Sequence, residues 1–328
     1  MFMKIPSLIA VIAGLFLFVS CDAGTARAAE DAAKAKQTSR RKVMTEAEAS
    51  AYGAPRTVDI EIQGRDDKGK WISHGAGSIL HEAGYILTCE HITAHGERQS
   101  VILADGTVYP YTVLARAGGS YDTAILKIKP TKPLKTVELG HSADLAKEEK
   151  VIVIGNPSGR RHTVTTGVVE KTTCGGGTQI HVGQSDVGPG DSGGPVFNLR
   201  GEQVALVHTK IFTLKRAGRH IRVDHIRDAF AKVFMNEKRY KQTIGLQVDC
   251  QSDQARVITV KKGSPAAVAG IKPGDVVTRF GSMDIRIGPH YVLALMDRVT
   301  ADPIKITLQR DGKKVEVSVR PQPRAASK

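Results

Sequence analysis

The chain has 328 residues, of which 41% are hydrophobic, 24% are charged and only 5% are aromatic, with 33 glycines. This composition is ordinary for a globular protein, and the length allows about two folded domains. Many glycines and few aromatic residues are typical of a β protein with many turns. The net charge is +14, but the small basic clusters at 160–162 and 261–262 have no aromatic stacking platform. Nucleic-acid binding is therefore disfavoured.

Residues 1–28 have the pattern of an export signal. Lys4 precedes an apolar run over 5–20, which is short for a membrane span, and Ala26-Arg27-Ala28 is a small-x-small cleavage site. A second interpretation stays open, because Val19-Ser20-Cys21 resembles the end of a bacterial lipobox. In that case Cys21 would carry a lipid anchor. Both interpretations predict an exported protein of the periplasm or cell envelope, either soluble or lipid-anchored.

Residues 29–55 are predicted to form a charged linker. The segment Glu30–Lys36 favours a helix but has no apolar face, and Arg40-Arg41-Lys42 is a run of like charge. Such segments bury too little surface to offset the entropy of ordering them.

From residue 57 the sequence has the pattern of short strands. Val58, Ile60 and Ile62 alternate with polar residues, which indicates a half-buried strand. Similar strand patterns recur until helical spacing begins at Val223, which predicts a helix over 223–238. Many short strands are best accommodated in closed barrels, because closure leaves no free edge. The further strand segments are 75–80, 101–103, 108–111, 151–157, 163–169 and 204–209.

Three segments carry the residue types of acyl-transfer chemistry. The apolar strand 84–90 runs into His91, and Asp122 opens a strand over 123–128. The segment 188–195 places Ser192 among four glycines and two prolines, which favour an exposed, rigid turn. A nucleophilic hydroxyl in such a turn needs a base and an orienting acid elsewhere in the chain. An isolated histidine or aspartate is more often structural, so the prediction depends on finding all three.

The order His91, Asp122, Ser192 resembles the trypsin-like serine proteases, and most closely the bacterial HtrA (Deg) branch, whose members carry a PDZ domain after the protease. The resemblance implies that His91 is the general base, Asp122 its orienting partner and Ser192 the nucleophile. It also implies an oxyanion hole formed by the backbone N–H groups of Gly190 and Ser192. The implied fold is mainly β, a chymotrypsin-like pair of six-stranded barrels with the triad between them.

The segment 263–277 looks like the PDZ domains of this branch, and Thr243–Val248 resembles their carboxylate-binding loop with the strand that follows. The resemblance implies that Ile244, Gly245 and Leu246 hold a peptide carboxylate while the peptide adds to a sheet edge. Residues 291–296 are predicted as the helix lining the groove, and 307–319 as a hairpin turning at Asp311-Gly312. The expected domains are a protease over 56–235, a PDZ domain over 236–322 and a tail over 323–328.

Substrate preference is open. Asp186 lies six residues before Ser192, where trypsin-like enzymes that prefer a basic P1 side chain carry an aspartate. The alternative is a solvated turn residue. Asp191 stands where the HtrA branch often has asparagine. His208 falls in the strand expected to pair with substrate, where it could make activity sensitive to pH, although a plain surface role is also consistent.

Four cysteines are present, at 21, 89, 174 and 250. If Cys21 belongs to the export segment, the remaining three allow at most one intramolecular disulfide. Cys89 is expected to be a small buried hydrophobe. No CxxC or HxxxH spacing indicates a metal site, so neither a metal nor a cofactor is expected.

The sequence therefore predicts an exported serine endopeptidase that cleaves unfolded or damaged envelope proteins through an acyl-enzyme. The PDZ domain would bind C-terminal peptides, and the resemblance implies a homotrimer or larger assembly. The alternative is a chaperone or peptide-binding protein that keeps the protease fold with an idle site.

Overall fold

The computed structural model describes residues 42–323, except 94–95, 211–216, 237–238 and 299. The predicted export signal, Cys21, the linker up to residue 41 and the tail from residue 324 lie outside the described residues. Among the helices of the described part, none is long and apolar enough to cross a membrane.

The first described element differs from the expected linker. Helix α2 (Glu46–Gly53) is capped by Thr45, whose side chain accepts the Glu48 N–H while Glu48 bonds back to the Thr45 N–H. Gly53 packs so closely against Phe197 that an added Cβ would lie 2.8 Å from its ring. The linker interpretation missed this helix because its apolar face is made of small residues and a glycine rather than large hydrophobic side chains.

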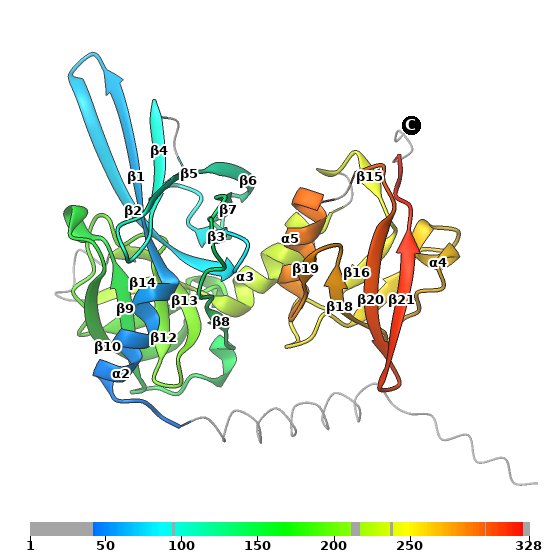
Figure 1. Ribbon diagram of the computed structural model, residues 1–328. Coiled ribbons are helices and arrows are strands. Elements are labelled where there is room, and N and C mark those ends of the chain that lie inside the picture. The colour runs from blue at the N-terminus through cyan, green and yellow to red at the C-terminus, as the bar shows by residue number, and fades with distance from the viewer. Residues whose placement is uncertain (1–41, 94–95, 211–216, 237–238, 299, 324–328) are drawn as a thin grey trace, which may run out of the picture. The chain divides into compact units, whose positions relative to one another are not determined.

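The first sheet contains seven antiparallel strands in the order β5-β4-β1-β2-β3-β7-β6. Its strands β1 and β2 form a long hairpin that projects from the sheet (Figure 1). The bounds are β1 (Thr57–Asp66), β2 (Gly69–His81), β3 (Tyr85–Thr88), β4 (Arg98–Ile102), β5 (Val108–Pro110), β6 (Thr112–Ala117) and β7 (Thr123–Lys127).

The second sheet closes on itself. Its order is β12-β9-β10-β11-β14-β13-β8, and an additional pairing of β12 with β13 completes a six-stranded barrel. The bounds are β8 (Glu138–Leu139), β9 (Lys150–Gly155), β10 (Thr163–Cys174), β11 (Gln179–Gly183), β12 (Pro195–Asn198), β13 (Glu202–Lys210) and β14 (Ala217–Arg222). Short 3₁₀ helices lie at η1 (Ala54–Arg56), η2 (Ser142–Asp144), η3 (Pro157–Gly159) and η4 (Gly175–Gly177).

The predicted chymotrypsin-like β fold is confirmed, with one refinement. Only the second sheet is a closed six-stranded barrel, whereas the described strands of the first curl into a half-barrel without a closing pair. The helix predicted over 223–238 forms as α3 (Val223–Ala229) and continues as the π-helical turn η5 (Phe230–Phe234), with Ile226, Phe230 and Phe234 buried.

The C-terminal part has the strands and helices of a PDZ domain, as predicted. A four-stranded sheet in the order β19-β18-β20-β21 is joined by the pairs β16–β17 and β15–β22. Asp311 and Gly312 both have positive φ, 49° and 75°, as a tight two-residue hairpin turn requires. The bounds are β15 (Gln242–Thr243), β16 (Leu246–Val248), β17 (Val257–Val260), α4 (Pro265–Val268), β18 (Val276–Phe280), β19 (Met283–Asp284), α5 (Gly288–Arg298), β20 (Ile304–Arg310), β21 (Lys313–Val319) and β22 (Gln322–Pro323).

Among the described residues, Arg227 is the largest fully buried side chain. Its guanidinium donates to the Leu139 carbonyl at 2.9 Å, and to the Cys250 and Ser252 carbonyls at 3.0 and 3.1 Å. Burial lowers the pKa of Arg227, while Asp253 opposes that shift. One buried cation therefore satisfies carbonyls from segments more than a hundred residues apart.

Arg227→Met should lower the free energy of unfolding by about 3 kcal/mol, because it leaves buried carbonyl oxygens without donors. Urea denaturation followed by circular dichroism measures this change. Arg65→Met, at an exposed position on the β1 strand, is the control and should change it little. An equal loss in both variants would show that the buried carbonyl contacts contribute nothing specific.

Candidate active site

His91 and Asp122 are brought together by two paired strands. Strand β3 ends three residues before His91, β7 begins one residue after Asp122, and Thr88 pairs with Ala124. His91 Nδ1 lies 2.6 Å from Asp122 Oδ2, and the His91 backbone N–H donates to Asp122 Oδ1 at 2.8 Å. The two residues predicted to be the general base and its orienting acid are therefore in direct contact.

The Asp122 carboxylate is buried but well supplied with donors. Burial alone raises the pKa of Asp122, but hydrogen bonds from His208 and His91 outweigh it and hold the pKa well below its usual range. Asp122 is therefore ionised at neutral pH. An ionised acid at Nδ1 fixes the His91 tautomer with its free lone pair on Nε2, where a general base needs it.

The turn that carries Ser192 requires glycine at two positions. Gly190 has φ of +102°, and a Cβ there would lie 2.2 Å from the Asn156 carbonyl oxygen. Gly193 has φ of +86°, and a Cβ there would lie 2.2 Å from Thr88 Oγ1. The turn is anchored by the Ser192 carbonyl, which accepts the Ala76 N–H at 2.9 Å. This close seating explains the glycine-rich sequence around the serine.

The backbone amides of Gly190 and Ser192 were predicted to form an oxyanion hole. Neither N–H has a recorded hydrogen-bond partner among the described residues. Two unpaired donors beside a nucleophile are what an oxyanion hole offers to a developing negative charge.

Ser192 itself is not hydrogen-bonded to His91 among the contacts of the described residues. Its hydroxyl donates instead to the backbone carbonyl of His208, at 3.3 Å. The ring of His91 remains accessible, with 45% of its side chain exposed. Two of the three predicted triad residues are thus in contact, and the third lies with its hydroxyl turned to β13.

His208 is a site residue whose position the sequence left open. Its Nε2 lies 3.2 Å from Asp122 Oδ2, and its ring meets that of His91 edge to face with centroids 5.9 Å apart. The surface interpretation is therefore wrong. No sequence signal could have decided between the two interpretations, because the contact joins strand β13 of the second sheet to a residue of the first.

Cys89 lies beneath this site. Its thiol donates to the Val207 carbonyl at 3.2 Å, and burial, followed by the charge of Asp122, raises its pKa well above the usual value. The side chains of Cys89, His91 and Asp122 have ligand atoms within 4.8 Å of one another, and these atoms already take part in hydrogen bonds, from the Cys89 thiol to Val207 and between His91 and Asp122. Cys89, Cys174 and Cys250 are all free thiols.

Asp186 was the candidate for a basic P1 pocket. Its side chain is exposed, although its neighbours Ser185 and Val187 are buried. This placement fits the alternative interpretation of a solvated turn residue better than that of a buried pocket carboxylate.

The segment predicted to be the carboxylate loop of the PDZ domain connects β15 to β16, and some of its polar groups already form hydrogen bonds within the protein. Gly245, with φ of +70°, donates its N–H to Thr243 Oγ1 at 3.1 Å. The Ile244 carbonyl accepts the Ala266 N–H. The Leu246 carbonyl accepts the hydroxyl of buried Tyr291, from α5, at 3.1 Å. A peptide that pairs with β16 would share the Leu246 carbonyl with the Tyr291 hydroxyl or displace that hydroxyl.

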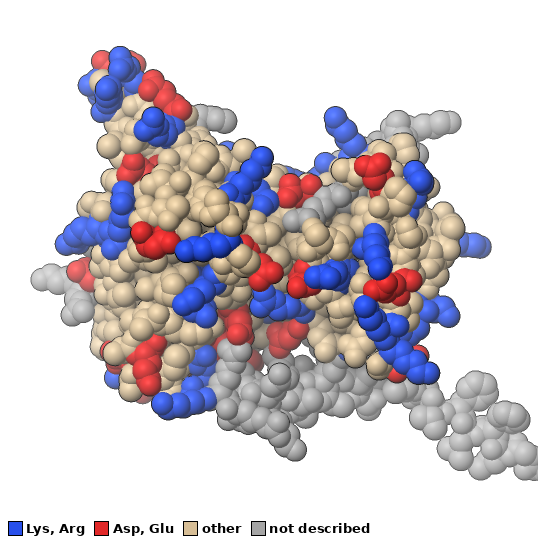
Figure 2. Space-filling model, viewed as in Figure 1, with Lys and Arg blue, Asp and Glu red and all other residues tan. Residues whose placement is uncertain are grey.

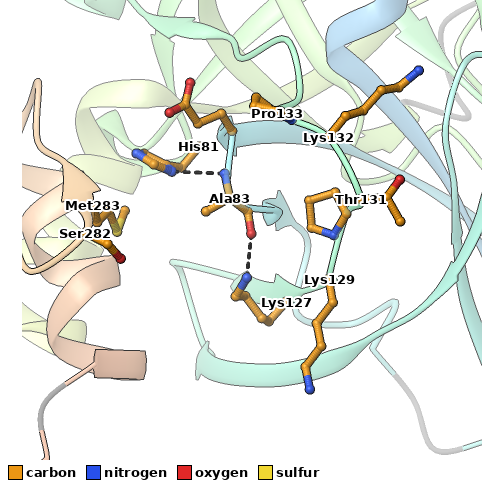
Figure 3. A pocket seen from close by; sticks show the side chains of 11 residues that line it. His81, Ala83, Lys127, Lys129, Thr131, Lys132, Pro133, Ser282 and Met283 are labelled. Atoms are coloured by element: carbon orange, nitrogen blue, oxygen red, sulfur yellow. Dashed lines mark hydrogen bonds between the residues drawn. The ribbon is translucent and has the colours of Figure 1, made fainter.

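A separate pocket contains none of the predicted site residues (Figure 3). Lys127 donates there to the Ala83 carbonyl, and His81 Nδ1 accepts the Ala83 N–H. These groups are already paired within the protein, so the pocket does not offer them to a substrate. Its lining includes His81, Glu82, Lys127, Lys129, Lys132 and Met283.

Two known families match this chain. The trypsin-like peptidase domain matches residues 75–206, which include His91, Asp122 and Ser192, and the PDZ domain matches residues 242–320. A protein from Arabidopsis thaliana, "Putative protease Do-like 14", is 30% identical over 314 residues, covering 85% of this chain and 71% of the relative. The chain belongs to the HtrA/Deg family of trypsin-like serine proteases. The resemblance seen in the sequence is confirmed.

Other members of the HtrA/Deg family are serine endoproteases. "Serine protease PepD" of Mycobacterium tuberculosis is 28% identical and covers 78% of this chain and 62% of the relative. "Probable periplasmic serine endoprotease DegP-like" of Pseudomonas putida is 31% identical, and the match covers 75% of this chain and 55% of the relative. The chain thus spans between 55% and 71% of the length of these three relatives.

Solved structures show the same fold. "HtrA-type protease AlgW with decapeptide" has a TM-score of 0.52 at 21% identity, covering 87% of this chain and all of that chain. "Crystal structure of the serine endoprotease from Yersinia pestis" has a TM-score of 0.51 at 22% identity, and the match covers 86% of this chain and 98% of that chain.

Asp191, next to Ser192, is buried, with only 4% of its surface exposed, and its Oδ2 accepts the Gly188 N–H at 2.7 Å. Burial raises the pKa of Asp191 to about 6, although the N–H groups of Gly188 and Asn156 oppose that shift. An unfolded aspartate has a pKa of about 3.9. The folded state therefore binds this proton more tightly, and stability falls as pH rises from about 4 to about 6.

Asp191→Asn should raise the free energy of unfolding at pH 8 by on the order of 2 kcal/mol, because it removes a buried charge. It should also flatten the dependence of stability on pH between about 4 and 6. Urea denaturation across this range measures both effects, with Asp186→Asn as the exposed neighbouring control. If the pH dependence of stability is unchanged in Asp191→Asn, the raised pKa of Asp191 is contradicted.

Proposed function

We propose that this protein is a serine endopeptidase that hydrolyses unfolded polypeptides, with His91, Asp122 and Ser192 as its catalytic triad. The observation that carries the proposal is the contact of 2.6 Å between His91 Nδ1 and Asp122 Oδ2. This pair stands beside a serine flanked by two backbone amides without recorded partners, in a chain of the HtrA/Deg family.

The reaction follows from these groups. Ser192 Oγ attacks the peptide carbonyl and gives its proton to His91 Nε2, while Asp122 stabilises the resulting imidazolium. The Gly190 and Ser192 N–H groups bind the oxyanion, and His91 then protonates the leaving amine. Water hydrolyses the acyl-enzyme by the same steps. The hydroxyl of Ser192 must first turn from the His208 carbonyl toward His91.

Location and substrates belong to the same proposal. A DegP-like relative carries the description periplasmic, and residues 1–28 have the pattern of an export signal. We therefore place the protein in the cell envelope, either soluble or anchored through Cys21, acting on unfolded or damaged proteins. We also propose a homo-oligomer built from trimers, which sedimentation analysis would test.

Ser192→Ala should abolish cleavage of unfolded casein, leaving less than about one thousandth of the activity, because the nucleophile is lost. Casein digestion by the two purified proteins, followed by mass spectrometry, measures this. Circular dichroism of both proteins controls for folding. Residual cleavage of equal rate in the variant would mean that a contaminating protease is responsible.

Asp186→Ala should leave the P1 preference unchanged, because the carboxylate of Asp186 is exposed rather than held in a pocket. Sequencing of casein product ends from the native protein and the variant compares the two preferences. A native preference for Lys or Arg that disappears in the variant would restore the pocket interpretation.

A chaperone or peptide-binding function is the second candidate. One observation favours it: Ser192 Oγ bonds to the His208 carbonyl and not to His91 among the described contacts. If casein stays intact even when C-terminal peptides are added, this candidate would replace proteolysis. Nucleic-acid binding has less support, since Lys and Arg are interspersed with Asp and Glu on the face shown in Figure 2.

The PDZ domain is proposed to bind C-terminal peptides at Ile244, Gly245 and Leu246. Tyr291→Phe should tighten that binding about threefold to tenfold, because the peptide then has no hydroxyl to displace from the Leu246 carbonyl. Fluorescence anisotropy of a labelled peptide measures the affinity. The same peptide with an amidated C-terminus is the control, and equal binding of both forms would exclude carboxylate recognition.

A further inference from the structure

We propose that His208 is a positioning residue of this active site, a second imidazole on the catalytic carboxylate whose protonation weakens catalysis. The proposal rests on the proposed protease function and adds a residue that the triad does not include. Its basis is that His208 reaches both Asp122, through its side chain, and Ser192, through its carbonyl.

Asp122 Oδ2 is shared by two imidazoles. His91 Nδ1 lies 2.6 Å from this oxygen and His208 Nε2 lies 3.2 Å from it. The other oxygen, Oδ1, accepts the His91 backbone N–H. A carboxylate oxygen can accept two hydrogen bonds. The direction of the Asp122 carboxylate is therefore set from the first sheet by His91 and from strand β13 by His208.

The tautomer of neutral His208 follows from its second contact. The side-chain Nε2 of Gln179, on β11, lies 3.3 Å from His208 Nδ1. An amide NH₂ group can only donate, so Nδ1 accepts and the ring proton resides on Nε2. That proton points at Asp122. The side chains form a directed chain in which Gln179 donates to His208, and His208 donates to the carboxylate that also holds His91.

Protonation of His208 would break this chain. An imidazolium carries N–H at both nitrogens, so its Nδ1–H would face the donor group of Gln179. It would also place a second positive charge on the carboxylate that must stabilise the His91 imidazolium during catalysis. Because like charges disfavour each other, His91 becomes a weaker base.

The groups around His208 do little to offset the positive charge that its protonation would add. Besides Asp122, the described titratable groups next to His208 are imidazoles and a thiol whose pKa is raised, and the carboxylate of Glu170 is paired with His181. His220, on β14, is fully buried, and burial, followed by the neighbouring histidines His208 and His181, lowers its pKa to about 3. His91 and Cys89 lie on the side of the first sheet and His220 lies on β14. Beyond His220 is His181 of β11, with its partner Glu170.

The proposal predicts two protonations on the acid side of the pH profile. For the native protein, log(kcat/KM) should fall with a slope above 1 at low pH, because protonation of His91 stops the reaction and protonation of His208 slows it. His208→Gln keeps a neutral N–H donor without a titrating ring, so its slope should be 1. Its kcat/KM at pH 8 should stay within about threefold of the native value.

His208→Ala removes the donor as well as the titration. Its slope should also be 1, but kcat at pH 8 should fall about tenfold with little change in KM, because Asp122 loses one of the contacts that orient it. His74 is a histidine away from this site, on the β2 strand. The His74→Gln variant is therefore the matched control and should retain the native pH profile. A slope above 1 in His208→Gln, or a native profile in His208→Ala, would overturn the proposal.

A second measurement keeps the test independent of proteolysis. In a Ser192→Ala background, the His91 Nδ1 proton can be followed by nuclear magnetic resonance as pH falls. We expect its shift to respond to two ionisations, and to one when His208→Gln is added. If Ser192-dependent cleavage is never found but these two ionisations are seen, the proposed function fails and the placement of His208 stands. A single ionisation in both proteins rejects the role of His208.

Discussion

The candidate site depends on one buried carboxylate. Asp122 is removed from water, and a charged oxygen in such a place is stable only if donors surround it. Three donors do so: the backbone N–H and Nδ1 of His91, and Nε2 of His208. These contacts hold the base in a single orientation and keep the acid ionised. Loss of any one of them would alter both properties together.

The donors come from different sheets, so the site exists only where the two sheets meet. Strands β3 and β7 of the first sheet supply His91 and Asp122, whereas Ser192 and His208 belong to the second. The Ala76 N–H binds the Ser192 carbonyl across this boundary, and the missing Cβ of Gly193 allows Thr88 to approach. Packing of the two sheets therefore sets the distance between Ser192 and His91.

Ser192 shows how little separates a resting arrangement from a reactive one. Its hydroxyl donates to the His208 carbonyl at 3.3 Å, so this bond must break before the hydroxyl can reach a base. A similar competition exists in the PDZ domain, where the Tyr291 hydroxyl occupies the Leu246 carbonyl that an added strand would use. In both places a ligand must replace a contact within the protein.

The amino-acid sequence by itself determined the order of His91, Asp122 and Ser192, the strand-rich fold and the PDZ segment. These features depend on local patterns, such as the glycines around Ser192 and the alternation of Val58, Ile60 and Ile62, which act within a few residues.

Tertiary structure alone decided the rest. The half-barrel form of the first sheet depends on pairing between strands that are far apart in the chain. Helix α2 is stabilised by the close packing of Gly53 against Phe197. The contact of His208 with Asp122 joins residues that are distant in sequence. Such contacts leave no periodic signal, because they are fixed by how the sheets pack and not by the residues next to each partner.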